Sequence, residues 1–527
     1  MSDPTTITNR AARAGRVLYG GLKRRGSIDT RTLAVFRMIV AVLIVGDVLS
    51  RSRNFHFYYT DDGAVTASMA SDGLNVFAYT SDPTIIAALF VVHALVALQL
   101  LVGYKTRVAM VISFVFVISL DQHNPLVTSY ADVLFRLLLF WALFLPLGER
   151  WSIDAVHRDR EARTSVFSIA TLGALFQMIA MYVINGYHKS GEELWTGGEA
   201  TPLIMGLDDT TFLLGETMRQ FPELLQLGGL TWYYMLLYGW LLFFLTGRLR
   251  LVFAGMFVVA HASFAVTVRI GAFPYVAMAG LLLFAQGEFW RDLDRLARLV
   301  GVPVDRLHAA AGRVGAVALV FPRHIPTAGG ELWTRRAVYT GVYGVAAFLV
   351  VALALLAVGT GAGVVPADEG PKEQVEDVAY DTMIYQPEWS IFAPIPRTTD
   401  RYHVFAAQTT TGERIDVYND REFTFERPGK ELQQQYGTYR ERFYMNSVRR
   451  AGDTGSASLA LAEHLCETWE GEDGEELTHV NMYYASEDVT LETIDSPEDR
   501  DRSTQVIYRH GCGDHEPTVI NPPSLVE

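Results

Sequence analysis

One lysine in this chain stands where an ionisable side chain is costly, at the end of a long apolar run. The stretch INGYHKSGEELW carries His188 and Lys189 directly after that run, in a chain with five lysines and 39 arginines. A lysine in surroundings of low dielectric loses much of its preference for the charged form, so it can act as a general base near neutral pH. A neighbouring histidine could orient a substrate or relay the proton. Lys189 is therefore the first candidate for chemistry.

Two further polar groups lie at comparable positions along the chain. His123 and Asn124 follow the third apolar run in the turn DQHN, and His261 lies inside the seventh run, in HASFAVTV. If these run ends face the same side, the two groups and Lys189 converge on one pocket. His123, His188 and His261 lack the spacing of a metal site, so we predict no metal.

A purely structural interpretation of these residues stays open. Lys189 could reach the membrane interface with its amine or pair with Glu192 or Glu193. His93, within the second apolar run, is typical of a packed histidine. The residues alone indicate one pocket and name no reaction.

The elements that must hold these residues are apolar runs of membrane-spanning length. We therefore predict an all-α polytopic membrane domain of about eight or nine transmembrane helices, followed by a small extracytoplasmic α+β domain. The predicted spans are 32–50, 84–103, 107–121, 131–147, 165–185, 231–247, 249–268, 272–287 and 338–362.

Lysine and arginine set the expected orientation, because they are enriched in cytoplasmic segments. The arm 1–31 and the arginine-rich linker 291–337, which we expect to contain an amphipathic helix, are basic. The main membrane domain, 32–290, and the last transmembrane helix, 338–362, then leave residues 363–527 outside the cell. We expect the first span to be an uncleaved anchor in the cell membrane.

Residues 363–527 are strongly acidic, with 33 Asp and Glu against 14 Lys and Arg. Acidity combined with a preference for arginine over lysine favours a salt-adapted, halophilic organism, and nucleic acid is not an expected partner. The only two cysteines, Cys466 and Cys512, lie in this part. An even pair outside the cell favours one disulfide, although two free thiols remain the alternative.

The acidic part has the pattern of a small α+β domain. YHVFAAQTTTGERIDVY predicts two strands around a Thr-Gly turn, and HVNMYYASEDVTLETI and STQVIYRHGC predict further strands. SASLALAEHLCETW has helical spacing, with Ser456 as its expected cap. The segment EWSIFAPIPR, with two prolines, is expected to be extended against the membrane or the sheet.

Five segments in order resemble the vitamin K-dependent γ-carboxylase-like family, also described as the horizontally transferred transmembrane (HTTM) domain. They are LAVFRMIVAVLIVGDVLSRSRNFHFYYTDDGAV, HALVALQLLVGYKTR, HNPLVTSYADVLFRLLLFWALFLPLGERWSID, NGYHKSGEELWTGGEA and HASFAVTVRIGAFPYVAMAGLLLF. The resemblance spans roughly residues 32–290. The tail, with EWSIFAPIPR followed by the hairpin GERIDV, is similar to the outer domain of many bacterial and archaeal members.

The resemblance implies a reaction and residues for it. The family's animal carboxylases use a lysine base on a reduced vitamin K, whose oxygen-dependent epoxidation drives carboxylation of glutamate. GYHK followed by Trp195 matches the stretch that holds this base, which assigns the role to Lys189. His188, His123 and His261 are then supporting groups, with Asn124, Trp195 and His261 contacting quinone or substrate.

One departure separates this chain from the animal enzymes. They have an Asn-His pair in the turn after the third span, where this chain has Asn124 followed by Pro125. We therefore expect a membrane enzyme that binds reduced menaquinone, with carboxylation of a protein or peptide acceptor on the outer side as a further step. The alternatives are a non-catalytic lipid- or partner-binding module and a quinone-linked oxidoreductase without epoxidation.

Overall fold

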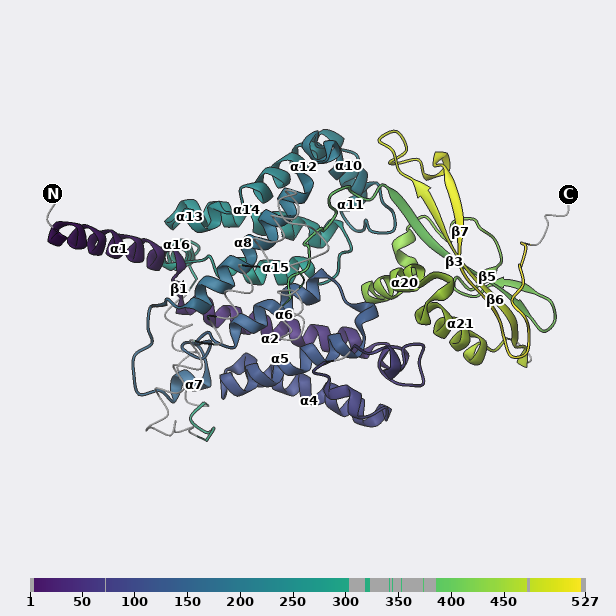
Figure 1. Ribbon diagram of the computed structural model, residues 1–527, viewed down its shortest axis with the longest axis horizontal. Coiled ribbons are helices and arrows are strands. Elements are labelled where there is room, and N and C mark those ends of the chain that lie inside the picture. Colours follow the sequence, from purple (N-terminus) through teal and green to yellow (C-terminus); the bar gives the residue numbers. More distant parts are fainter. Residues whose placement is uncertain are drawn as a thin grey trace.

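The structure is a computed structural model of the whole chain. It describes residues 4–302, 318–322 and 385–522, apart from 72, 472 and 473, together with the single positions 341, 344, 352 and 373. The predicted span 338–362 and most of the predicted linker 291–337 lie outside the described residues. Figure 1 shows a helical body at one end and a sheet with two helices at the other.

The helical body contains the helices from α1 to α16. They are α1 (Pro4–Gly26), α2 (Thr30–Ser52), α3 (Phe55–Tyr59), α4 (Pro83–Val102), α5 (Thr106–His123), α6 (Tyr130–Ala142), α7 (Ile153–Val156), α8 (Ile169–Lys189), α9 (Glu193–Thr196), α10 (Ala200–Met205), α11 (Gly215–Arg219), α12 (Pro222–Leu237), α13 (Leu241–Phe244), α14 (Gly247–Thr267), α15 (Phe273–Leu282) and α16 (Gly287–Leu299). A two-residue pairing of β1 (Ile28–Asp29) with β2 (Ser165–Val166) joins the starts of α2 and α8.

Five of the described helices, α2, α4, α5, α8 and α14, are long and apolar enough to cross a membrane. Their bounds agree closely with five predicted spans. Side-chain caps fix three of their starts: Asp29 accepts from the first turn of α2, Asp82 accepts from that of α4, and Ser168 forms a capping box with Thr171 in α8.

Three other predicted spans form shorter helices than their hydropathy indicates. The run 131–147 becomes α6, with 13 residues, and 272–287 becomes α15, with ten. The run 231–247 is divided between the end of α12 and the four-residue α13. Hydropathy measures how apolar a segment is, but it does not show where the helix turns within a packed bundle.

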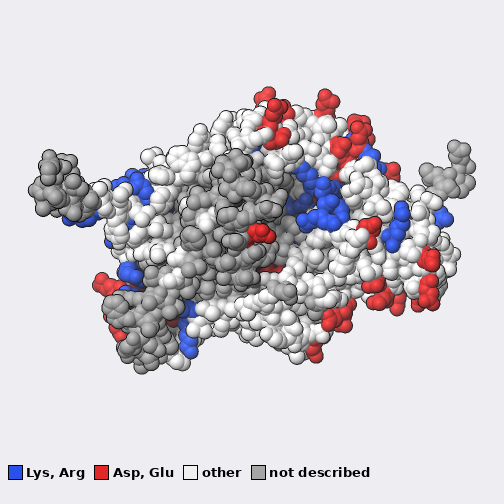
Figure 2. Space-filling model, in the orientation of Figure 1, with Lys and Arg blue, Asp and Glu red and all other residues white. Residues whose placement is uncertain are grey.

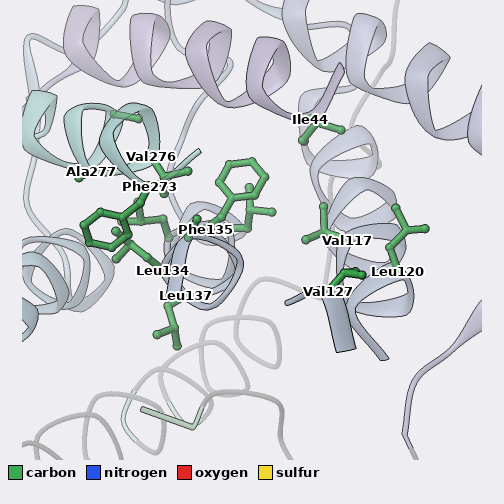
Figure 3. Close-up of a cluster of buried hydrophobic side chains, with 14 of the residues drawn as sticks. Ile44, Val117, Leu120, Val127, Leu134, Phe135, Leu137, Phe273, Val276 and Ala277 are labelled. Carbon is green, nitrogen blue, oxygen red and sulfur yellow. The ribbon is translucent and has the colours of Figure 1, made fainter. Parts of the chain in front are cut away.

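The helices of the body share one apolar core, part of which is drawn in Figure 3. Ile44 of α2, Val117 of α5, Leu134 of α6 and Val276 of α15 belong to it, and each is 3% exposed or less. The core therefore holds α6 and α15 against the long helices, although these two are short.

A buried charge cluster ties this core to the C-terminal part. Arg51 of α2 pairs with Asp121 of α5 at 2.8 Å and with Asp132 of α6 at 3.3 Å. Arg440, from the C-terminal part, pairs with Asp132 at 2.8 Å and also with Asp47 of α2. Asp121 is thus an ion-pair partner rather than a free acid.

The C-terminal part contains an antiparallel sheet in the order β5-β4-β3-β6-β7. Its elements are β3 (Thr399–Thr409), β4 (Arg414–Asp416), β5 (Arg421–Glu422), α20 (Tyr439–Ala451), α21 (Ser456–Thr468), β6 (Leu477–Asp488) and β7 (Arg502–Gly511). The four predicted strand segments correspond to β3 with β4, β6 and β7. Helix α20 was not predicted.

One expected cap is wrong. The N-cap of α21 is Gly455, and Ser456 is the first helical residue, so its hydroxyl does not cap the helix. Cys466 of α21 and Cys512, just after β7, form a disulfide with 5.6 Å between their Cα atoms. The bond fastens α21 to the edge of the sheet.

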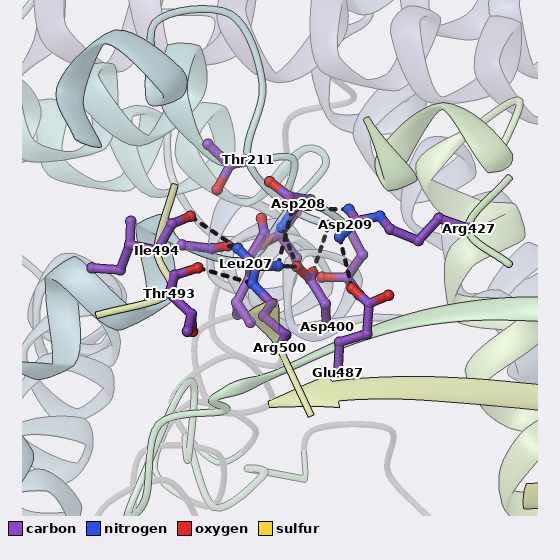
Figure 4. A network of polar contacts seen from close by, with 12 residues as sticks. Leu207, Asp208, Asp209, Thr211, Asp400, Arg427, Glu487, Thr493, Ile494 and Arg500 are labelled. Carbon is purple, nitrogen blue, oxygen red and sulfur yellow. Dashed lines mark hydrogen bonds and ion pairs between the residues drawn. The ribbon is translucent and has the colours of Figure 1, made fainter. Parts of the chain in front are cut away.

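The two parts meet in a second buried charge network, drawn in Figure 4. Asp208, in the loop after α10, pairs with Arg219, Arg427 and Arg500 at 2.6–3.0 Å. Asp400 of β3 pairs with Arg500 at 2.6 Å and accepts the backbone N–H groups of Asp208 and Asp209. The sheet is therefore anchored on the helical body.

Candidate functional site

Helix α8 presents Asn185 and Lys189 on one face, because residues four apart in a helix are neighbours on its surface. Gly186 lets α8 approach α12 closely: a Cβ on Gly186 would lie 2.7 Å from the backbone nitrogen of Leu237. The helix ends at Lys189, which is 1% exposed although it is the last residue of the helix.

The Lys189 amine is bound by backbone oxygens and an aromatic ring. Nζ donates to the carbonyls of Ile391 at 2.6 Å and Phe392 at 3.1 Å. It also lies 4.0 Å from the centre of the Trp195 ring, the distance of a cation–π contact. Among the described residues no carboxylate pairs with it, so the alternative of an ion pair with Glu192 or Glu193 is not seen.

Side chains at the end of α8 hold the segment that supplies these carbonyls, by contacting its backbone oxygens. Asn185 Nδ2 donates to the carbonyls of Trp389 at 2.7 Å and Ile391 at 3.0 Å. His188 Nε2 lies 3.0 Å from the carbonyl of Glu388, and Trp195 donates to that of Phe392 at 3.0 Å. We call residues 388–392 the strap, because they run from the C-terminal part across the end of α8. EWSIFAPIPR packs on the membrane helices, but the expectation that it is extended is wrong. The chain turns at Ile391 and Phe392, where the N–H of Ala393 donates to the carbonyl of Ser390 at 3.1 Å.

A narrow cavity of about 80 Å³ lies behind the strap. Its walls are mostly apolar and aromatic, and its polar lining includes Asn185, Lys189, Tyr182 and His261. The other lining residues are Met181, Trp195, Thr201, Ile204, Met205, Trp232, Leu236, Phe264, Val268, Ile270, Phe273, Ile391 and Phe392.

Tyr182 and His261 form a polar pair in the lining of this cavity. The Tyr182 hydroxyl and His261 Nε2 share a hydrogen bond of 2.8 Å, and both side chains are buried. His261 Nδ1 is buried and has no hydrogen-bond partner within the described part of the chain. A ligand in the cavity could satisfy this nitrogen.

The structure brings together only some of the predicted site residues. Lys189, Trp195 and His261 line the cavity, whereas His188 contacts the strap outside it. His123 and Asn124, expected in the same pocket, do not line it. His123 Nε2 lies 3.2 Å from the Tyr59 carbonyl, and Asn124 donates to the Tyr58 carbonyl at 3.1 Å. The turn after α5 therefore packs on α3 and not on α8.

Sequence reasoning missed two parts of this site. Asn185 and Tyr182 lie on the α8 face that carries Lys189, so their four- and seven-residue spacing from Lys189 could have identified them. The strap carried no such signal, since it contributes carbonyl groups that every residue possesses. Within the described residues, no group of three or more His, Cys, Asp and Glu has the geometry to hold a metal ion.

Comparison with known proteins gives one match. Residues 26–290 match the HTTM domain, which includes α8, Lys189, Trp195 and His261. No curated protein and no solved structure matches the chain. The match covers half of the chain and the membrane helices that line the cavity. The chain therefore belongs to the HTTM family of γ-carboxylase-like membrane proteins.

Proposed function

We propose that the cavity at Lys189 binds a reduced naphthoquinone such as menaquinol, and that the protein catalyses its oxygen-dependent epoxidation. One observation supports this most strongly: a buried lysine that pairs with no carboxylate of the described residues ends a cavity with aromatic walls. Such a site suits a flat ring with polar substituents, because apolar walls cover the ring and a few polar groups orient it.

The lining residues fit the quinol in chemical type. Trp195, Trp232 and Phe264 offer ring faces or edges, while Lys189 and the Tyr182–His261 pair offer hydrogen-bonding groups. The bound quinol would supply the ring hydroxyl to be deprotonated, and its reaction with O₂ would give the 2,3-epoxide and water.

The chain's own residues would then have distinct roles. Lys189 Nζ, in its neutral form, would accept the proton of a quinol hydroxyl. His261 Nδ1 would hold the second oxygen of the ring, because this nitrogen has no hydrogen-bond partner among the described residues. Asn185 and Trp195 would keep the strap over the site and exclude water.

Carboxylation of a protein or peptide acceptor is a further step, which would need CO₂ and an acceptor carbanion. His123 lies outside the cavity and Pro125 follows Asn124, so no histidine from this turn serves the site. We therefore propose epoxidation as the primary activity and treat the acceptor as its optional partner.

A second function is favoured by the contacts of the Lys189 amine. Because Nζ donates to two strap carbonyls, Lys189 could serve as an anchor in a non-catalytic membrane module. Substituting arginine for Lys189 distinguishes the two functions. Arginine keeps the donors needed for anchoring but stays protonated, so it cannot act as a base.

The test uses the full-length protein in membranes, with reduced menaquinone, bicarbonate and oxygen, and mass spectrometry of the extracted quinones. Wild type is compared with Lys189→Arg, and with Lys105→Arg as the matched control, since Lys105 is exposed on a loop. We expect epoxide from wild type and Lys105→Arg, and at least 100-fold less from Lys189→Arg, the typical effect of losing a general base.

Equal epoxide from wild type and Lys189→Arg would reject the role of Lys189 as the base. Redox turnover without an oxygenated product would favour the quinone-linked oxidoreductase, and no conversion in any sample would favour the non-catalytic module. Isotopically labelled bicarbonate in the same reaction shows whether carbon is fixed into an acceptor.

A further inference from the structure

A surplus of arginine gathers where the sheet meets the helical body. Figure 2 shows a patch of basic side chains at this border, close to where β3 begins and α20 lies in Figure 1. Basic side chains are unexpected here, because residues 363–527 have a net charge of −19. Four arginines near this border repel one another: Arg401 interacts with Arg397 and Arg449, and Arg442 interacts with Arg397.

Two of the four share one carboxylate. Arg397 forms a bidentate pair with Asp209, with one contact at 2.7 Å. Arg442 of α20 lies 3.6 Å from the same carboxylate, beyond hydrogen-bonding distance. Asp209 therefore neutralises only one of the two charges.

The other two have no ion pair within the described residues. Arg401, on β3, is partly exposed. Burial, and then the positive charges of Arg397 and Arg449, lower the pKa of Arg401 to about 10. Arg449 lies over the Tyr484 ring at 5.4 Å, and its Nε is buried without a hydrogen-bond partner among these residues.

The neighbouring carboxylates are already bound by other arginines. Asp208 has Arg219, Arg427 and Arg500, and Asp400 has Arg500. Glu487 pairs with Arg427 at 2.6 Å and with Arg502 at 3.2 Å. Among the described residues the four-arginine cluster thus has one carboxylate, Asp209, for four positive charges, and an external anion would relieve its repulsion.

Exposed apolar side chains lie close in sequence to Asp209 and Arg397. Leu213 and Leu214 follow Asp209 by four and five residues and are 69% and 54% exposed. Ile395, two residues before Arg397, is 65% exposed. A ligand that carries both a negative group and an acyl chain would match this combination.

We propose that Arg397, Arg401, Arg442 and Arg449 form a binding site for a phosphate group, supplied by the headgroup of an anionic membrane lipid. Guanidinium groups match phosphate oxygens in bidentate geometry, and Leu213, Leu214 and Ile395 contact the lipid's apolar part. This site is separate from the Lys189 cavity and does not depend on the function proposed for it. It would hold the sheet against the membrane surface.

The test measures thermal unfolding of the full-length protein in neutral detergent, titrated with a short-chain phosphatidylglycerol. Short-chain phosphatidylcholine is the control without net charge, because its choline cation balances its phosphate. Inorganic phosphate tests a soluble source. The variants are Arg401→Gln and the double variant Arg401→Gln with Arg449→Gln. The control is Arg450→Gln, which removes an exposed charge from α20, the helix that carries Arg449.

We expect phosphatidylglycerol to raise the melting temperature of wild type and Arg450→Gln at the same concentrations. Loss of one charge-assisted contact should weaken the apparent affinity of Arg401→Gln about tenfold, and the double variant more. Without lipid, Arg401→Gln should melt at or above the wild-type temperature, because the substitution relieves repulsion. A weaker lipid response then cannot result from unfolding.

Equal stabilisation by inorganic phosphate would support the phosphate site with a soluble source. Stabilisation by phosphatidylglycerol alone would support the lipid. Equal responses of wild type and Arg401→Gln to phosphatidylglycerol would overturn the proposal, and so would equal stabilisation by phosphatidylglycerol and phosphatidylcholine. A wild type that responds to neither lipid nor phosphate would overturn it too.

Discussion

Two buried cations, Lys189 and Arg500, show how differently this protein uses positive charge. All five N–H donors of Arg500 are engaged, by two carboxylates and by the carbonyls of Gly206, Ile494 and Thr493. Within the part of the chain that the structure describes, the Lys189 amine contacts only carbonyls and one ring, beside a cavity. A fully paired charge specifies how two parts of a fold dock, whereas a charge without a counter-ion beside a cavity is a candidate for chemistry.

Removing the paired cation should have the largest effect on stability. In Arg500→Met, Asp400 loses the one cation that contacts it among the described residues and stays fully buried. Breaking a buried pair in this way costs about 3 kcal/mol or more. Chemical denaturation of the full-length protein measures the loss, with Arg509→Met, an exposed position on β7, as the control. Similar values for the two variants would contradict the docking role.

A buried basic side chain can be neutral instead of paired, and His403 in β3 is such a case. It is 2% exposed, and burial lowers its pKa to about 3. The unfolded chain binds a proton near pH 6.5, so stability is complete above that pH and is lost as pH falls toward 3. Between pH 6.5 and 5 the loss from this residue is about 2 kcal/mol.

His403→Phe should flatten this part of the pH profile. The measurement is the unfolding free energy at pH 7, 6 and 5 for wild type and variant. An unchanged slope in the variant would show that His403 is not the group responsible.

Replacing Lys189 should lower the free energy of unfolding less than replacing Arg500. In Lys189→Met the Ile391 carbonyl still accepts a hydrogen bond from Asn185, and the Phe392 carbonyl still accepts one from Trp195. No buried carboxylate of the described residues is left unpaired, so we expect a loss of about 1 kcal/mol. Lys189→Arg should lose even less stability. A loss in Lys189→Met as large as that in Arg500→Met would show that Lys189 is chiefly an anchor.

The smallest effect should come from a paired charge whose partners face water. Burial would raise the pKa of Glu149, but hydrogen bonds from Arg163 and the nearby charge of Arg158 outweigh it and bring the pKa to about 2. The stabilisation is present above pH 4.5 and is lost as pH falls through 2. Glu149→Gln should cost under about 1 kcal/mol at pH 7, and less in high salt. A cost that salt does not reduce would count against this account.

The sequence predicted most of what depends on local patterns. The long spans and the strands follow from apolar runs and alternation. That Lys189 and His261 line one cavity follows from their positions along the helices, whereas Trp195 was named from the family resemblance. The short α6 and α15 did not follow, because their lengths are set by packing in the bundle.

The parts that could not be predicted depend on long-range contacts. Lys189 is 202 residues from Ile391, whose backbone oxygen binds it. His123 was expected beside Lys189, but α5 ends against α3, so its ring meets the Tyr59 carbonyl. The orientation of the chain in the membrane and its salt-adapted origin remain predictions.

Equilibrium binding shows whether the cavity at Lys189 holds a quinone ring. The measurement is the affinity of the full-length protein for a short-chain menaquinone, compared with Ile204→Phe, which would fill the cavity from α10, and Leu249→Phe, an exposed position on α14. We predict binding to wild type and Leu249→Phe, and a loss of at least tenfold in Ile204→Phe. Equal affinity in all three proteins would mean that the ring binds elsewhere, and would contradict the account.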